Sequence, residues 1–156
     1  MRVRDPPDAA HARGCGARGH PEGKEWMMAL TEVLRDHGDR LRTEQLVAVI
    51  EAASDCAAHC EACADACLEE GDPSLTRCIR SDLDCADICR ATAKVVGRAG
   101  ASGAPWLELV EVCAQACANC AEECEQHADH HDHCRACAEA CRRCEQACRD
   151  LLAAAR

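Results

Sequence analysis

The chain has 156 residues, with 28 acidic and 18 basic side chains and a formal net charge of −10. Such an acidic surface repels nucleic-acid phosphates and anionic lipid headgroups, so we expect neither nucleic acid nor a membrane as a partner. The sequence also holds 17 cysteines but only 2 tryptophans, with no phenylalanine or tyrosine, which excludes a core built on aromatic packing.

The N-terminal segment, residues 1–23, is interrupted by proline and glycine and has no apolar stretch. We predict that it is a disordered tail rather than a secretory signal. The protein is therefore expected in the cytoplasm, where the reducing environment keeps cysteines as thiols. Cys15 lies in this tail, and no function is assigned to it.

Residues 24–156 are predicted to form one helical domain, because apolar residues recur at helical spacing. The predicted helices cover residues 25–37, 40–70, 73–96, 105–127 and 130–154. Asp39 is expected to cap the second helix, Gly71 to end it, Asp72 to cap the third, and Asp129 or Asp132 to cap the last. Short connections between long helices favour antiparallel neighbours. We predict an all-α fold, an antiparallel up-down four-helix bundle with a short extra N-terminal helix.

Cysteines recur on each long helix with a helical rhythm. Residues 56–67 read CAAHCEACADAC, and residues 113–124, CAQACANCAEEC, repeat the same 4, 3, 4 spacing. At about 100° per residue, each such set falls within an arc of roughly 60°, the face that a bundle helix turns toward its axis. Sixteen cysteines are thus expected to line the interior: Cys56, Cys60, Cys63, Cys67, Cys78, Cys85, Cys89, Cys113, Cys117, Cys120, Cys124, Cys134, Cys137, Cys141, Cys144 and Cys148.

The cysteines cluster toward one end of the predicted bundle. They occupy the C-terminal halves of two helices and begin near the N-termini of the other two, and these ends coincide in an antiparallel arrangement. The same inward positions carry apolar residues at the opposite end: Leu46, Val49, Val96, Trp106, Val110 and Leu151. We therefore expect a thiol-lined interior closed at one end by hydrocarbon.

Soft metal binding explains such a core better than the alternatives. One or two buried cysteines can be ordinary core residues, but a thiol at nearly every inward position risks oxidation without improving packing. Cu(I) favours thiolate and accepts two or three ligands, and replacing one proton by one Cu(I) leaves the core charge unchanged. We predict storage of many Cu(I) ions. A metallothionein-like sink for Zn(II), Cd(II) or other soft metals remains the alternative, and no arrangement of nucleophile and base suggests an enzyme.

The cysteine pattern on all four long helices resembles that of the cysteine-rich four-helix-bundle copper storage proteins, in particular their cytosolic branch. The resemblance covers roughly residues 25–155. It implies storage of many Cu(I) ions in a preformed bundle, protection against copper toxicity and assembly into a homotetramer. The copper would come from a copper chaperone or a small-molecule carrier.

Histidines gather at the junction of the last two predicted helices: His127, His130, His131 and His133. His127 and His130 continue the inward positions of their helices, so they are expected to point into the bundle as a port for Cu(I). A solvated helix connection is the simpler alternative. Asp82 fills a position that the repeat elsewhere gives to cysteine, where it would act as a polar gate, pair with a histidine or contact solvent.

Overall fold

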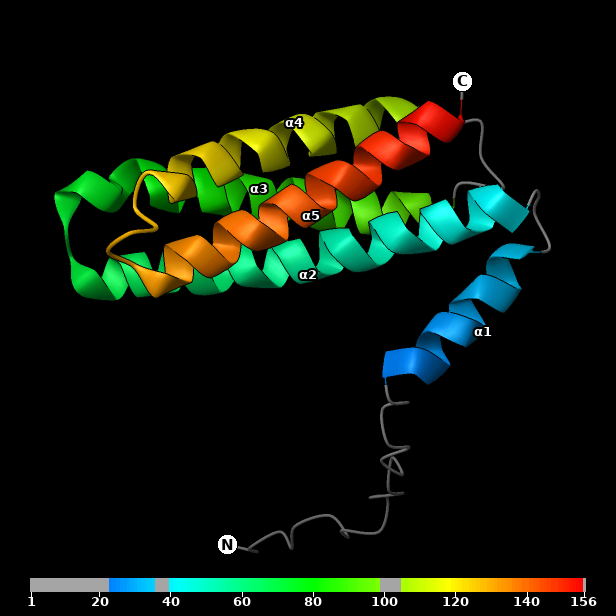
Figure 1. The fold of residues 1–156 in the computed structure, drawn as a ribbon, viewed down its shortest axis with the longest axis horizontal. Coiled ribbons are helices and arrows are strands. Elements are labelled where there is room, and N and C mark those ends of the chain that lie inside the picture. The colour runs from blue at the N-terminus through cyan, green and yellow to red at the C-terminus, as the bar shows by residue number, and fades with distance from the viewer. Residues whose placement is uncertain (1–22, 36–39, 99–104, 156) are drawn as a thin grey trace, which may run out of the picture.

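The computed structural model describes residues 23–35, 40–98 and 105–155. Its elements are α1 (Gly23–Arg35), α2 (Arg40–Glu70), the 3₁₀ helix η1 (Pro73–Leu75), α3 (Thr76–Val96), α4 (Trp106–Glu125) and α5 (Asp132–Ala154). Helices α2 to α5 lie along a common axis, whereas α1 projects from the end at which α2 begins (Figure 1). The predicted tail up to residue 22, Cys15 and the expected cap Asp39 lie outside the described residues.

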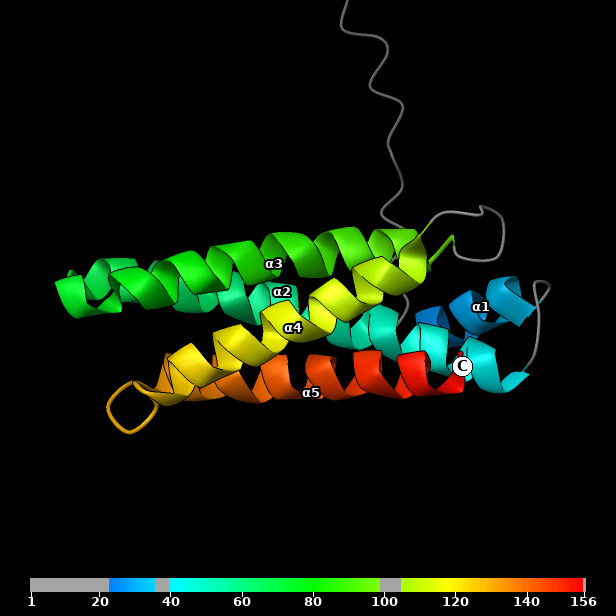
Figure 2. The same ribbon diagram turned by 90° about the horizontal axis from the view of Figure 1, so that it is seen from above.

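The four long helices form a closed ring of neighbours. Helix α2 packs against α3 and α5, and α4 packs against the same two helices. Successive helices run in opposite directions, as the two perpendicular views show (Figures 1 and 2). Helix α1 packs onto α2, and its Leu34 side chain is buried as part of the hydrophobic core. The predicted antiparallel four-helix bundle with a short additional helix is therefore confirmed.

The turn between α2 and α3 follows the signals in the sequence. Gly71 ends α2 with a φ of 65°, a left-handed conformation that glycine adopts without a steric penalty. The Asp72 carboxylate accepts a hydrogen bond of 2.8 Å from the backbone N–H of Ser74, as expected of a cap. The predicted helix 73–96 differs at its start, because Pro73–Leu75 forms a 3₁₀ turn before α3 begins at Thr76.

The connection between α4 and α5 is longer than expected. The predicted helices 105–127 and 130–154 correspond to α4, which ends at Glu125, and α5, which begins at Asp132. His131 occupies the capping position of α5 and makes no side-chain capping hydrogen bond. The prediction of Asp129 or Asp132 as the cap is therefore wrong. Asp132 instead lies in the first turn, where its negative charge complements the helix dipole.

The bundle interior divides into an apolar part and a thiol part. All six residues expected at the apolar end are buried, and we call them the hydrocarbon plug: Leu46, Val49, Val96, Trp106, Val110 and Leu151. Buried alanines such as Ala53, Ala57 and Ala121 lie beside the core cysteines, and their small side chains let the helices approach closely. None of the helices among the described residues is both long and apolar enough to cross a membrane.

Candidate metal site

The sixteen cysteines of the four long helices all lie in the core, each with at most 1% of its surface exposed. All are free thiols, so no disulfide links them in the described part of the chain. Their sulfur atoms contact one another between helices. Cys56 of α2 lies 3.5 Å from Cys141 of α5, and Cys89 of α3 lies 3.5 Å from Cys117 of α4. The predicted convergence of the thiols on the bundle axis is thus observed.

The thiols form overlapping groups of four whose ligand atoms all lie within 4.8 Å of one another. These groups include Cys56–Cys60–Cys85–Cys141, Cys56–Cys89–Cys117–Cys144, Cys60–Cys120–Cys137–Cys141 and Cys63–Cys67–Cys78–Cys134. Cys56, Cys60 and Cys141 each belong to two of them. A sulfur shared between two groups can bridge two metal ions, so the arrangement favours a continuous cluster of soft monovalent ions over separate tetrahedral sites.

Asp82 lies inside the thiol core and is completely buried. Its Oδ1 accepts hydrogen bonds from Cys120 at 3.1 Å, Cys124 at 3.3 Å and Cys137 at 3.4 Å. Its Oδ2 accepts a fourth, of 3.7 Å, from Cys78. The possibility that Asp82 contacts solvent is therefore wrong, and its hydrogen-bond partners among the described residues are thiols rather than histidines.

Burial favours the uncharged form of Asp82 and of several core thiols. Removal from water, together with the surrounding thiols, raises the pKa of Asp82 far above its ordinary value. Desolvation likewise raises the pKa of Cys67 to about 12 and increases that of Cys134. Other core thiols are shifted the opposite way, and at Cys63 interactions led by that with Cys124, and including one with His133, lower the pKa to about 6. Of the three thiols that His133 contacts, Cys63 is the one whose pKa is lowered.

His133 connects the thiol core with the surface. Its Nδ1 lies 3.4 Å from Cys63 Sγ, 3.5 Å from Cys134 Sγ and 3.9 Å from Cys67 Sγ. Its Nε2 lies 2.9 Å from Oε1 of Glu70, at the end of α2. Partial burial lowers the pKa of His133, but its contacts with Cys63 and Glu70 outweigh burial and raise the pKa overall. Of the four histidines predicted to form a port for Cu(I), His133 is the one whose imidazole lies against cysteine sulfur atoms.

His131 lies beside His133 and shares the same carboxylate. Its Nδ1 is 2.8 Å from Oε2 of Glu70, and the centroids of the two imidazole rings are 5.4 Å apart. Glu70 was not identified from the sequence. Its position one helical turn after Cys67 was the available signal, since residues three apart on a helix share a face.

The structure contradicts the helical pattern at one of the other two histidines, His130. His130 is exposed, so the prediction that it points into the bundle is wrong. His127 is partly buried, with 19% of its side chain exposed, and its Nε2 lies 3.7 Å from Oε1 of Glu123. Glu123 in turn pairs with Arg77 across a 2.8 Å contact. The helical pattern failed at His130 because this residue follows the end of α4.

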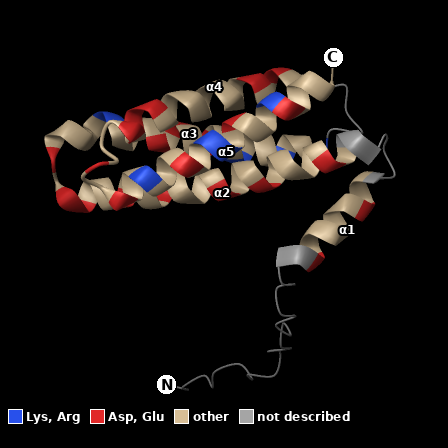
Figure 3. Cartoon of the chain, in the orientation of Figure 1, with Lys and Arg blue, Asp and Glu red and all other residues tan. Residues whose placement is uncertain are grey.

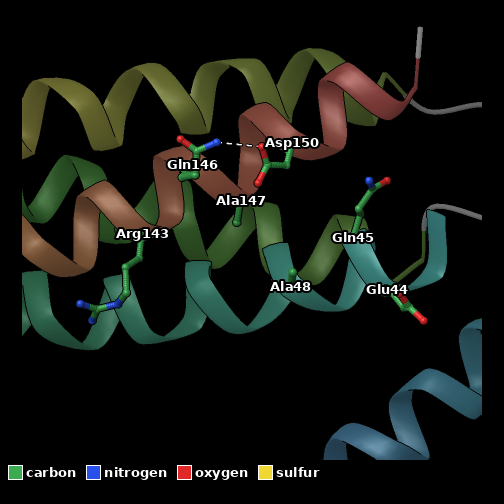
Figure 4. A pocket seen from close by; sticks show the side chains of 7 residues that line it. All are labelled: Glu44, Gln45, Ala48, Arg143, Gln146, Ala147 and Asp150. Atoms are coloured by element: carbon green, nitrogen blue, oxygen red, sulfur yellow. Dashed lines mark hydrogen bonds between the residues drawn. The ribbon is translucent and has the colours of Figure 1, made fainter. Parts of the chain in front are cut away.

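A surface groove between α2 and α5 is separate from the thiol core (Figure 4). It is lined by Glu44, Gln45, Ala48, Arg143, Gln146, Ala147 and Asp150. Gln146 donates a 2.7 Å hydrogen bond to Asp150, and no thiol lines the groove. Because no thiol lines it, the groove contributes nothing to the metal chemistry of the core. Elsewhere on the surface, acidic residues are frequent along the bundle and near the turn that joins α2 to α3 (Figure 3).

Solved structures of other proteins share this fold and much of the sequence. A cytosolic copper storage protein from Streptomyces lividans, described with five coppers, is 48% identical over 74% of this chain and 98% of that chain, with a TM-score of 0.68. The copper storage protein Ccsp from the same organism, loaded with 10 copper equivalents, is 46% identical over 80% of this chain and 98% of that chain, with a TM-score of 0.70.

A third similar structure is the Cu(I)-bound copper storage protein Csp3 of Bacillus subtilis. It is 40% identical over 67% of this chain and 95% of that chain, with a TM-score of 0.61. The family model described as copper storage protein matches residues 42–153, which include all sixteen core cysteines. These matches confirm the resemblance drawn from the cysteine spacing and agree with a storage role rather than a catalytic one. The chain belongs to the copper storage protein family.

Proposed function

We propose that the sixteen core cysteines are the ligands with which this protein stores many Cu(I) ions and protects the cell against copper toxicity. The observation that carries the proposal is the set of overlapping thiol groups contributed by four helices. Bridging sulfurs allow roughly one Cu(I) for each core cysteine, because each ion needs only two or three sulfur ligands.

Charge distinguishes Cu(I) from the alternative, Zn(II). Sixteen thiols that exchange their protons for sixteen Cu(I) ions leave the core neutral. Four Zn(II) ions on sixteen thiolates would leave eight negative charges uncompensated in a region removed from water. Burying unpaired charge is costly, and among the residues whose burial the structure describes no buried side chain is basic and able to offset it. Cu(I) therefore suits this core better than Zn(II) or Cd(II).

Cu(I) is proposed to enter at the histidine end, where His131 and His133 lead from the surface to Cys63, Cys67 and Cys134. Imidazole nitrogen is an acceptable ligand for copper, and the Nδ1 of His133 lies within 4 Å of all three sulfurs. His127 and His130 are retained in the proposal only as outer residues of the same connection. The copper would be supplied in the cytoplasm by a copper chaperone or a small-molecule carrier.

The protein is further proposed to assemble into a homotetramer, as the family resemblance implies. Helix α1 supports an intermolecular contact, because Met28 and Val33 are 73% and 64% exposed although both are apolar. Light scattering on the reduced protein measures the assembled mass, and a monomer at micromolar concentration would contradict this part of the proposal.

An anaerobic titration with Cu(I) against a competing chelator tests the storage proposal. The reduced protein should be helical before metal is added and should take up about 16 ions, by the estimate of one ion per core thiol. Cys117→Ser should lower the capacity, whereas Cys15→Ser, outside the core sequence, serves as the control. Saturation at about one or two ions, or displacement of bound Cu(I) by equimolar Zn(II), would refute storage of Cu(I).

A further inference from the structure

One carboxylate contacts two imidazoles at the histidine end of the bundle. Oε1 of Glu70 lies 2.9 Å from Nε2 of His133, and Oε2 lies 2.8 Å from Nδ1 of His131. The two histidines thus approach Glu70 through different ring nitrogens. An ionised carboxylate only accepts hydrogen bonds, so each of these nitrogens must carry the proton of its ring.

The two contacts therefore fix two different neutral forms of histidine. In a neutral imidazole one nitrogen carries a proton and the other a lone pair, and the hydrogen bond made by the first decides which is which. His133 donates from Nε2, which leaves the lone pair on Nδ1, the nitrogen that lies 3.4 Å from Cys63 Sγ. His131 donates from Nδ1, which leaves its lone pair on Nε2.

We propose that Glu70 is a positioning residue for metal uptake, which holds His131 as the Nδ1–H tautomer and His133 as the Nε2–H tautomer. This inference rests on the proposed function, since it concerns the route by which Cu(I) reaches the thiols. His133 then presents a lone pair to an ion shared with Cys63 and Cys134, while His131, 23% exposed, keeps Nε2 available for an incoming ion. Carboxylates that orient metal-binding histidines in this way raise their basicity and fix the ring.

The end of α2 holds the Glu70 carboxylate in reach of both rings. Glu70 is the last residue of the helix and follows Cys67 by one turn, and Gly71 then reverses the chain. Glu69, its neighbour, is exposed, and in the described part of the chain both histidines pair with Glu70 rather than with Glu69. Replacing Glu69 therefore changes the local charge by the same amount without removing the proposed hydrogen bonds, which makes it a matched control.

The tautomers can be measured in the reduced, copper-free protein by long-range ¹H–¹⁵N correlation spectra of ¹⁵N-labelled histidine, at a pH above the histidine titration. The wild-type protein should show His131 protonated at Nδ1, although Nε2–H is the commoner tautomer of an unconstrained imidazole. Glu70→Ala should convert His131 to Nε2–H, and Glu69→Ala should leave the wild-type pattern. A wild-type His131 protonated at Nε2, or an Nδ1–H tautomer that survives Glu70→Ala, would overturn the proposal.

Uptake kinetics supply the second measurement. Stopped-flow transfer of Cu(I) from a chelator should be about tenfold slower for Glu70→Ala than for Glu69→Ala, the size typical of losing such a supporting contact. The final capacity should be the same, because Glu70 binds no core ion. Equal rates for the two variants would refute the role of Glu70 in uptake. A wild-type protein that binds no Cu(I) would instead refute the proposed function, and the copper-free spectra would still decide the tautomers.

Discussion

Replacing Asp82 by asparagine should stabilise the copper-free protein, and the gain should grow as the pH rises. Asp82 is fully buried among four thiols, and desolvation raises its pKa far above the ordinary value. The folded protein must therefore hold this carboxyl protonated at neutral pH, whereas the unfolded chain ionises it above a pKa of about 3.9. Asparagine mimics the neutral acid, since it keeps an oxygen for the thiols of Cys120, Cys124 and Cys137.

The magnitude follows from the linked proton. Because the pKa in the folded state is raised, the stability associated with Asp82 is fully present below about pH 3.9 and is lost as the pH rises toward the folded-state pKa. The loss is about 1.4 kcal/mol for each pH unit in that interval. Between about pH 5 and pH 8 the wild-type protein should lose roughly 4 kcal/mol relative to Asp82→Asn, an upper value for a rigid, dry core.

Denaturant unfolding of both proteins, under reductant and at the two pH values, measures this difference. The core thiols begin to ionise in the unfolded chain near the upper pH, but they do so in both proteins and cancel from the comparison. Asp84→Asn, an exposed change two residues away on the same helix, provides the control and should show no such pH dependence. A difference between wild type and Asp82→Asn that is equal at both pH values would refute a protonated, buried carboxyl.

Two further predictions concern stability outside the thiol core. Val110→Ala in the hydrocarbon plug should lower the free energy of unfolding by about 2 kcal/mol, because burial is lost and a cavity is left behind. Val112→Ala, at a site 52% exposed on the same helix, should change the free energy of unfolding by less than about 0.5 kcal/mol. Equal losses for the two variants in chemical denaturation would contradict the burial of Val110 in the plug. Gly71→Ala should lower the free energy of unfolding by about 1 kcal/mol, because the φ of Gly71 is 65°. Gly97→Ala should be neutral or stabilising, because Gly97 has an ordinary helical φ of −60°. Thermal unfolding that ranks the two variants in the opposite order would show this reasoning to be wrong.

Most of the fold and of the thiol core could be predicted from the sequence, because both depend on periodicity within long helices. A cysteine at every third or fourth position defines one face, and four such faces meet only at a bundle axis. The same argument placed the hydrocarbon plug. Each of these inferences needed only residues on one helix at a time, together with the antiparallel order that short connections impose.

The histidine end was less predictable because its geometry depends on a turn and on distant residues. His130 was assigned an inward position by extending a helix that in fact ends at Glu125. The pairing of Glu70 with His133 joins residues 63 positions apart and has no periodic signature. The burial of Asp82 was likewise unclear, because a polar residue in a cysteine repeat can face either solvent or the core. These features depend on side-chain contacts between helices, which spacing along one helix does not determine.

The hydrocarbon plug closes one end of the bundle interior. Trp106, Val110 and Leu151 fill the end opposite the histidines, and none of the six plug residues is a cysteine or a histidine. Cu(I) held deepest would thus have to leave by the route along which it arrived, past every sulfur nearer the histidines. Release of Cu(I) would then proceed in the reverse order of uptake, and the ions bound last would be the first available to the cell.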